Sequence, residues 1–156
     1  MNVALRLPTD VELATYLQRL IAGYAEDMVV NGGLEPDVAK RKSEADNAAL
    51  FPEGRPGAGT AVYVVEVDGV PVGNAMLGER DRFGRQFAFV YDIIVNEEQR
   101  GRGIGRRGME LLEEEARRRG FDRIELNVFG GNVVARSLYR SLGYDEVAVT
   151  MGKSIG

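Results

Sequence analysis

The sequence predicts a mixed α/β fold: a mostly antiparallel central sheet with one parallel strand pair, flanked by about four helices. Apolar residues recur at helical spacing near the N-terminus, whereas the middle of the chain has short apolar runs separated by turn residues. A later strand, glycine-rich turn, helix and strand follow in the order of a right-handed crossover, whose two strands are parallel. No linker or internal repeat is present, so residues 1–156 are expected to form a single domain.

The first part of the chain is predicted to form a short strand and two helices. Val3–Leu7 is strand-like, and either Thr9 or Asp10 can cap the helix that follows. The apolar residues of this helix recur at helical spacing: Leu13, Leu17, Leu20, Ile21, Tyr24 and Met28. A second helix is expected over Pro36–Leu50, because proline suits the first helical position.

Three strands are predicted next, connected as a meander. They cover Val62–Val67, Val70–Leu77 and Phe87–Val95. The pair Asp68-Gly69 is a strong hairpin turn signal, and Asp81–Arg85 is the second turn.

The C-terminal part is predicted to alternate helices and strands. A helix covers Gly103–Arg119, where glutamate precedes arginine by four residues three times, a favourable surface pattern. Arg123–Val128 is the next strand. Asn132 caps a last helix ending at Leu142, and Tyr144–Met151 is expected to close the sheet as a strand.

Composition restricts the available chemistry. The chain has no cysteine and no histidine, which excludes disulfides, a cysteine nucleophile and the commonest general base. Acid–base chemistry must therefore use Asp, Glu, Tyr, Lys, the backbone or water, and no metal is expected. No apolar run approaches the roughly 20 residues of a membrane span, and the N-terminus lacks a signal-peptide layout, so a cytoplasmic protein without a membrane partner is expected. The net charge of -4 argues against nucleic acid as a partner.

The turn Gln99–Arg107 is the stretch most informative about function. It connects the strand Phe87–Val95 to a helix, so its glycines expose backbone N–H groups at a helix N-terminus, with arginines on both sides. Such an arrangement binds phosphate groups. The sequence therefore predicts a phosphorylated cofactor.

Other readings of this turn fit less well. Gly103–Gly108 matches G-x-G-x-x-G, with Glu125 about 20 residues beyond it, where a ribose-binding acid would stand. A dinucleotide fold needs further parallel units after the motif, and fewer than 50 residues remain. The Gly-Lys-Ser/Thr of a Walker loop is absent. A turn that binds nothing needs one glycine rather than three, since each glycine in a first helical turn costs about 1 kcal/mol.

Two segments resemble the GNAT superfamily of N-acetyltransferases. Arg100–Gly105 looks like its R/Q-x-x-G-x-G/A acetyl-CoA pyrophosphate loop, and Leu126–Tyr144 is similar to its N-x-x-A-x-x-L-Y-x-x-x-G-F/Y segment. Two motifs in the right order, about 30 residues apart, are more specific than either alone. The resemblance covers residues 87–145 and implies a GNAT-like sheet that splays open between Phe87–Val95 and Arg123–Val128.

The resemblance implies acetyl-CoA as co-substrate, with its pantetheine arm in the gap and its pyrophosphate on the glycine loop. The implied binding residues are Ile93, Ile94, Val95, Arg100, Gly101, Arg102, Gly103, Ile104, Gly105, Arg106, Asn132, Ala135 and Tyr139. The last three residues of this set share one face of a helix, because they stand at positions i, i+3 and i+7.

The implied reaction is direct attack of a primary amine on the acetyl thioester. Tyr139 can protonate the departing thiolate, and a backbone N–H near Ile94 would stabilise the developing oxyanion. Asp92 and Glu26 are candidate bases, directly or through water; a purely structural role for Asp92 stays open. Asp92 interrupts an apolar strand, where burial raises the pKa of a carboxyl group. It shares the acceptor side with Tyr91 only if the strand contains a bulge, which this family often has.

The acceptor is expected to be a small-molecule or peptide amine, whose identity the sequence does not reveal. A homodimer is compatible with the resemblance. The alternative function is a non-catalytic acyl-CoA-binding or sensor module on the same fold.

Overall fold

The computed structural model describes residues 1–156, with five strands in one sheet. The strands are β1 Val3–Arg6, β2 Ala61–Val67, β3 Val70–Arg82, β4 Arg85–Val95 and β5 Ile124–Leu126. Their order in the sheet is their order in the chain. The first three pairings are antiparallel and the β4–β5 pairing is parallel, which confirms the predicted mixed sheet.

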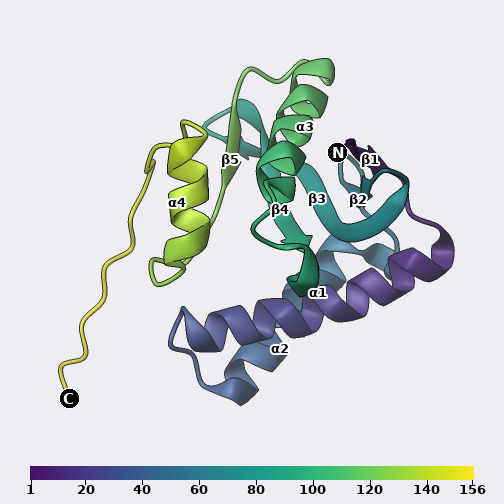
Figure 1. The fold of residues 1–156 in the computed structure, drawn as a ribbon. Helices are drawn as coiled ribbons and strands as arrows, with labels where there is room; N and C mark the ends of the chain where they lie inside the picture. Colours follow the sequence, from purple (N-terminus) through teal and green to yellow (C-terminus); the bar gives the residue numbers. More distant parts are fainter.

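Four helices surround the sheet (Figure 1). They are α1 Asp10–Val30, α2 Pro36–Leu50, α3 Ile104–Arg118 and α4 Val133–Ser141, joined by the short 3-10 turns η1 Pro52–Gly54 and η2 Glu97–Gln99. The paired helices α1 and α2 lie apart from α3, with the sheet between them (Figure 1). None of the helices combines the length and the apolar content that a membrane span requires.

The first helix starts at a capping box, which settles the choice of cap left open by the sequence. Thr9 Oγ1 accepts a hydrogen bond from the Glu12 amide at 3.2 Å, and Glu12 Oε1 accepts one from the Thr9 amide at 2.9 Å. Glu12 also receives two hydrogen bonds from Arg6 at 2.8 and 2.9 Å. The same carboxylate therefore starts α1 and fastens it to the end of β1.

Each face of the sheet buries its own apolar core. On one side, in the α3-side core, Met109 and Leu112 of α3 are fully buried against Leu77 of β3. On the other side, in the α1-side core, Tyr16 of α1 packs with Met76 of β3. The antiparallel strands present alternate residues to the two cores, as the strand pleat requires.

A bulge in β4 turns two neighbouring residues toward the same face. Met76 pairs with Asp92, but Leu77 pairs with Val90, so Tyr91 is the extra residue. Tyr91 packs against the α1-side core, and Asp92 bonds Tyr16 of α1. The bulge that the resemblance implied is present.

The sheet opens beyond the middle of β4. β5 pairs with β4 only through Ala88, Phe89 and Val90, and it ends at Leu126. The rest of β4 continues to Val95 without β5 beside it. The splayed strand pair implied by the resemblance is thus confirmed.

The predicted strand Tyr144–Met151 is wrong. The chain forms no strand after β5, and Figure 1 shows the C-terminal segment extending away from the end of α4. Gly143, with φ of +94°, turns the chain at the end of α4, and the segment gains no strand neighbour. Its alternating apolar side chains, which mimic a strand pattern, stay exposed at Val147 and Val149. Alternation of apolar and polar residues therefore does not form a strand when the segment has no neighbouring strand to pair with.

Val134, Leu138 and Leu142 stand at positions i, i+4 and i+8, a spacing that predicts one buried face of the last helix, but they are not buried equally. Leu138 and Leu142 are half-buried, and Leu142 packs against the α3-side core. Val134 is 84% exposed, so the prediction of a buried face is wrong for this residue. It lies in the first turn of α4, which the tertiary structure leaves open to solvent.

The two apolar environments can be compared by truncation. We expect Leu112→Ala to lower the free energy of unfolding by about 2 to 5 kcal/mol, because it leaves a cavity in the α3-side core. The control Val134→Ala should change it by less than about 0.5 kcal/mol, because that side chain is exposed. Urea unfolding followed by circular dichroism measures both; equal losses would contradict the assignment of the two environments.

Candidate active site

A cleft of about 1880 Å³ opens where β4 and β5 part. Its walls come from α1, β4, β5, α4 and the C-terminal segment, and its lining includes Asp92 and Tyr139. The bulge at Tyr91 brings Tyr91 and Asp92 to this cleft together. The opening of the sheet thus collects side chains that are far apart in the sequence.

Asp92 is held by a tyrosine that the sequence analysis did not single out. Tyr16 Oη donates a hydrogen bond to Asp92 Oδ2 at 2.8 Å. Tyr16 is only 1% exposed, while Asp92 as a whole residue is half-buried and opens on the cleft. Protein atoms nevertheless crowd its carboxylate, and this desolvation raises the pKa of Asp92 to about 6, although Tyr16, Arg19 and the Ile93 amide favour the charged form.

Tyr139 lies on the α4 side of the same cleft. Its ring is half-buried and packs against the α3-side core, with its centroid 6.0 Å from that of Tyr144. Desolvation, and then the negative charges of Asp92 and Asp27, raise the pKa of the Tyr139 hydroxyl. No protein group forms a hydrogen bond with this hydroxyl. It is therefore a protonated phenol with a free donor, close enough to Asp92 for the charge of that carboxylate to raise its pKa.

The structure does not bring Glu26 to the cleft, which corrects the prediction for this residue. Glu26 is exposed and absent from the cleft lining, whereas its neighbour Asp27 lines it. Successive helical residues differ by about 100° in direction, so only one of the two can face the cleft. Asp27 accepts a hydrogen bond from Asn31 Nδ2 at 2.6 Å. The spacing from Tyr16 through Leu20 to Asp27, at i, i+4 and i+11, is the signal that would have identified this face.

The glycine loop before α3 leaves a row of backbone amides unused. Gly101 and Gly103 adopt φ of +76° and +80°, a conformation that favours glycine. Gly103 caps α3 without any side-chain hydrogen bond. The six amides from Gly101 to Arg106, which include those of Arg102, Ile104 and Gly105, donate to no protein atom. Free amides at a helix N-terminus bind anions.

The arginines around this loop differ from the other arginines of α3. Arg100, Arg102 and Arg106 have no acidic side chain within 4.0 Å, whereas Arg107 pairs with Glu110 at 3.2 Å and with Glu114 at 3.0 Å. Arg102 donates to Gln99, and Arg106 donates to Ser141 of α4. The loop thus carries three positive charges that no carboxylate neutralises, beside the end of α4.

The open edge of β4 is the third predicted part of the cofactor site. Ile93 and Ile94 line the cleft, and the Val95 carbonyl accepts a hydrogen bond from Arg100 Nε at 2.9 Å. The Val95 carbonyl points away from β3, because the amide of the same peptide unit, that of Asn96, donates to Val72 of β3; Val95 itself does not line the cleft. Gly108 lets α3 approach this strand, since a Cβ there would lie 2.9 Å from Ile93 Cδ1. The glycine that completes the G-x-G-x-x-G match therefore serves helix packing.

The other predicted residues of α4, Asn132 and Ala135, do not line the cleft but contact each other at the start of the helix. Asn132 Oδ1 accepts a hydrogen bond from the Ala135 amide at 3.2 Å, which confirms the predicted cap. The Asn132 Nδ2 group has no protein partner, and both residues are half-buried. The side-chain amide can thus cap the helix and still donate a hydrogen bond.

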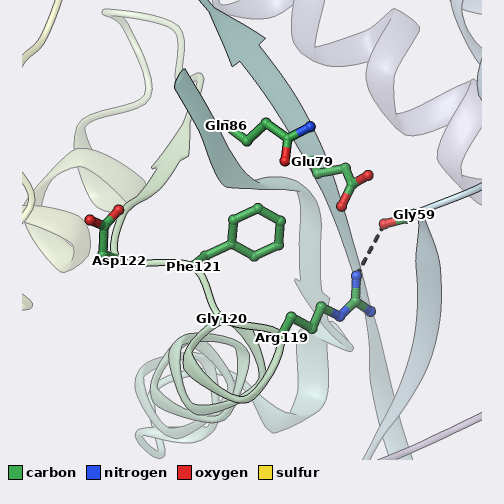
Figure 2. Close-up of a pocket in the computed structure, with 7 residues that line it drawn as sticks. All are labelled: Gly59, Glu79, Gln86, Arg119, Gly120, Phe121 and Asp122. Atoms are coloured by element: carbon green, nitrogen blue, oxygen red, sulfur yellow. Dashed lines mark hydrogen bonds between the residues drawn. The ribbon is translucent and has the colours of Figure 1, made fainter. Parts of the chain in front are cut away.

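A second depression, of about 530 Å³, lies at the opposite end of α3 from the glycine loop (Figure 2). Figure 2 shows Phe121 pointing into it, and Arg119 Nη1 donating to the Gly59 carbonyl at 3.0 Å. The 15 residues of α3 separate it from the free amides by about 22 Å. Neither Asp92 nor Tyr139 lines this depression, so the predicted catalytic pair lies in the larger cleft.

Comparisons with known proteins place this geometry in a family. The uncharacterized N-acetyltransferase YycN of Bacillus subtilis (strain 168) is 28% identical over 99% of this chain and 100% of its own. The crystal structure of YycN has a TM-score of 0.90, covering 99% of both chains. The L-methionine sulfoximine/L-methionine sulfone acetyltransferase of Salmonella typhimurium (strain LT2) is 30% identical over 69% of this chain and 64% of its own.

More distant structures share the fold. An aminoglycoside N-acetyltransferase solved in complex with CoA has a TM-score of 0.66 at 16% identity, covering 99% of this chain and 95% of its own. The acetyltransferase (GNAT) family pattern matches residues 26–144, most of the sequence. With the splayed sheet and the free-amide loop, this match shows that the chain belongs to the acetyltransferase (GNAT) family.

Proposed function

We propose that this protein transfers an acetyl group from acetyl-CoA to a primary amine by direct attack. The observation that carries the proposal is the row of six unpartnered amides from Gly101 to Arg106, flanked by three arginines without acidic partners. This row stands beside the gap between β4 and α4, since Arg106 bonds Ser141 and Arg100 bonds the Val95 carbonyl. A diphosphate there would receive hydrogen bonds and positive charge together.

The remaining predicted residues suit the rest of the co-substrate. Ile93 and Ile94 of β4 line the cleft, and the Asn132 side-chain amide retains a free donor, so the β4 backbone and Asn132 can bond the amides of a pantetheine arm. Ala135, beside Asn132, adds little bulk to the same helical face. Bound in this way, the thioester would supply an activated acetyl group near Tyr139 and Asp92.

Asp92 and Tyr139 can divide the proton transfers of the reaction. With a pKa of about 6, Asp92 is mostly ionised at neutral pH and can take a proton from the acceptor ammonium, directly or through water. Tyr139 keeps its proton at neutral pH, because its pKa is raised, and can donate it to the departing CoA thiolate. The attacking nitrogen thus forms the N–C bond while the C–S bond breaks.

The names of the relatives suggest two classes of acceptor. One relative is named for methionine sulfoximine and methionine sulfone, and a structural neighbour for aminoglycosides. Amino acids and amino sugars both present primary amines, so both belong in a screen.

The first test is a panel of primary amines with detection of free CoA thiol. We expect turnover with at least one amine, and a fall in kcat of about 100-fold for Tyr139→Phe with CoA affinity within about twofold, because the phenol acts on the leaving group. If acetyl-CoA binds tightly and no amine releases thiol, the protein is a non-catalytic acyl-CoA-binding module. Unchanged kcat in Tyr139→Phe would remove this residue from the mechanism.

The second test concerns the pH dependence of Asp92. Its pKa in the fold, about 6, exceeds its ordinary value of 3.8, so its contribution to stability is complete below about pH 4 and is lost as the pH rises through 6. Asp92→Asn should therefore match the wild type near pH 4 and exceed it by about 1 to 3 kcal/mol at pH 7.5. The variant should also lose the acid limb near pH 6 in kcat/KM.

Glu26→Gln is the matched control, because Glu26 is exposed on the same helix that holds Tyr16. It should keep both the stability profile and the acid limb of the wild type. An Asp92→Asn variant that keeps the acid limb would exclude Asp92 as the base.

The third test concerns the phosphate loop. Gly103→Glu places bulk and negative charge on the free amides, so we expect CoA affinity to fall at least about tenfold by calorimetry. Gly120→Glu is the control, because Gly120 also has a positive φ, of +91°, but follows the other end of α3. Equal affinity in both variants would argue against the loop as the diphosphate site.

A further inference from the structure

One arginine of the cleft has no role in the proposed chemistry. The Arg80 guanidinium carbon lies 3.6 Å from the centroid of the Phe89 ring and 5.1 Å from that of Tyr91. The two rings contact each other edge to face, with centroids 4.9 Å apart. Stacking uses the flat face of a guanidinium and leaves its N–H groups free at the edge. Only Nε has a partner, the Tyr91 hydroxyl at 3.5 Å. Arg80 is therefore oriented by the protein while its other donors stay unused.

The charge of Arg80 is also uncompensated. Eight basic side chains line the cleft, and six have an acidic partner within 4.0 Å: Lys42, Arg82, Arg117, Arg123, Arg136 and Arg140. Of the other two, Arg19 bonds Asn96 and lies near enough to Asp92 to favour its ionised form. Arg80 has no carboxylate partner. It is thus the cation of the cleft that is left for a ligand.

Arg80 lies on the same face of the sheet as Asp92, and the strand register gives the distance between them. Arg80 pairs with Phe87 and Met76 pairs with Asp92, so four residues, or about 13 Å of strand, separate the two levels. The Arg80 side chain leans toward Asp92, because its guanidinium lies over Phe89 rather than over Phe87. About 7 Å of strand then remains between the guanidinium and the level of Asp92. A short molecule can span this distance with an amine at one end and an anion at the other.

We propose that Arg80 binds the carboxylate of the acceptor and that the acceptor is a short aminocarboxylate, an inference that rests on the acetyl-transfer function proposed above. The planar fork of an arginine matches a carboxylate in two parallel hydrogen bonds. One uncompensated arginine matches one negative charge, because the nearby Arg82 and Arg123 are already paired with Glu125. The aromatic pair beneath Arg80 forms an apolar floor for the carbon chain.

The experiment uses aminocarboxylates paired with their uncharged carboxamides: L-alanine, L-leucine, β-alanine and 4-aminobutyrate. Turnover is measured with wild type, Arg80→Gln and Arg80→Lys, and the ratio within each pair is compared between variants, so that differences in amine reactivity cancel. For the best carboxylate, Arg80→Gln should raise KM by about 10- to 100-fold, while KM for its carboxamide and for acetyl-CoA changes less than about twofold. Arg80→Lys should lie between the two, because it keeps the charge and loses the fork.

Arg85→Gln is the matched control. Arg85 lies on the same hairpin and does not line the cleft. Its substitution by Gln removes the same charge, so the Arg85→Gln variant should behave as wild type. An equal effect of Arg80→Gln on carboxylate and carboxamide, or no preference for carboxylates in the wild type, would overturn the proposal.

A second measurement separates this proposal from the proposed acetyl transfer. If no member of either series releases thiol, the transfer function fails, and calorimetry of 4-aminobutyrate and L-leucine with CoA-saturated protein still tests Arg80. At least tenfold weaker binding of either to Arg80→Gln supports the anion site. Equal binding, or no binding to the wild type, overturns it.

Discussion

β4 and β5 share three paired positions, and β4 then continues from Tyr91 to Val95 without a neighbour on that side. A sheet edge inside a domain is normally covered, because its backbone groups otherwise stay unsatisfied. Here the edge borders a cleft instead. The bulge at Tyr91 stands where the pairing ends, and the free amides before α3 follow the end of the strand. The proposed acid–base groups and the proposed phosphate site therefore depend on one local parting of two strands.

Charge is organised around this opening in two distinct ways. Along α3, arginines and glutamates neutralise one another, as in the pairs of Arg107 with Glu110 and Glu114. Such exposed pairs contribute little to stability, yet they keep the helix surface without net charge. At the N-terminus of α3 and above Phe89, arginines have no acidic partner. The contrast separates neutralised surface charge from the unpaired charge that we propose binds ligands.

Local sequence signals predicted much of this arrangement. The hairpin at Asp68-Gly69, the cap at Asn132 and the glycine loop all depend on short-range chemistry, and each is found where it was predicted. The alternation in Tyr144–Met151 was misleading, because a strand depends on a partner elsewhere in the chain. Glu26 was predicted as a candidate base although Asp27 lines the cleft, because packing, and not local sequence, decides which face of a helix points into a cleft. The site roles of Arg80 and Tyr16 could not be predicted from local sequence. Arg80 contacts Tyr91, 11 positions away, and Tyr16 contacts Asp92, 76 positions away.

The close approach at Gly108 has a mechanical consequence. Without a side chain at this position, α3 rests directly on Ile93, one residue from Asp92. The N-terminal part of the helix therefore packs closely on the bulged strand. The backbone would then fix the distance between the proposed diphosphate site and the proposed position of the thioester. A co-substrate whose arm is shorter or longer than pantetheine would not place its thioester correctly.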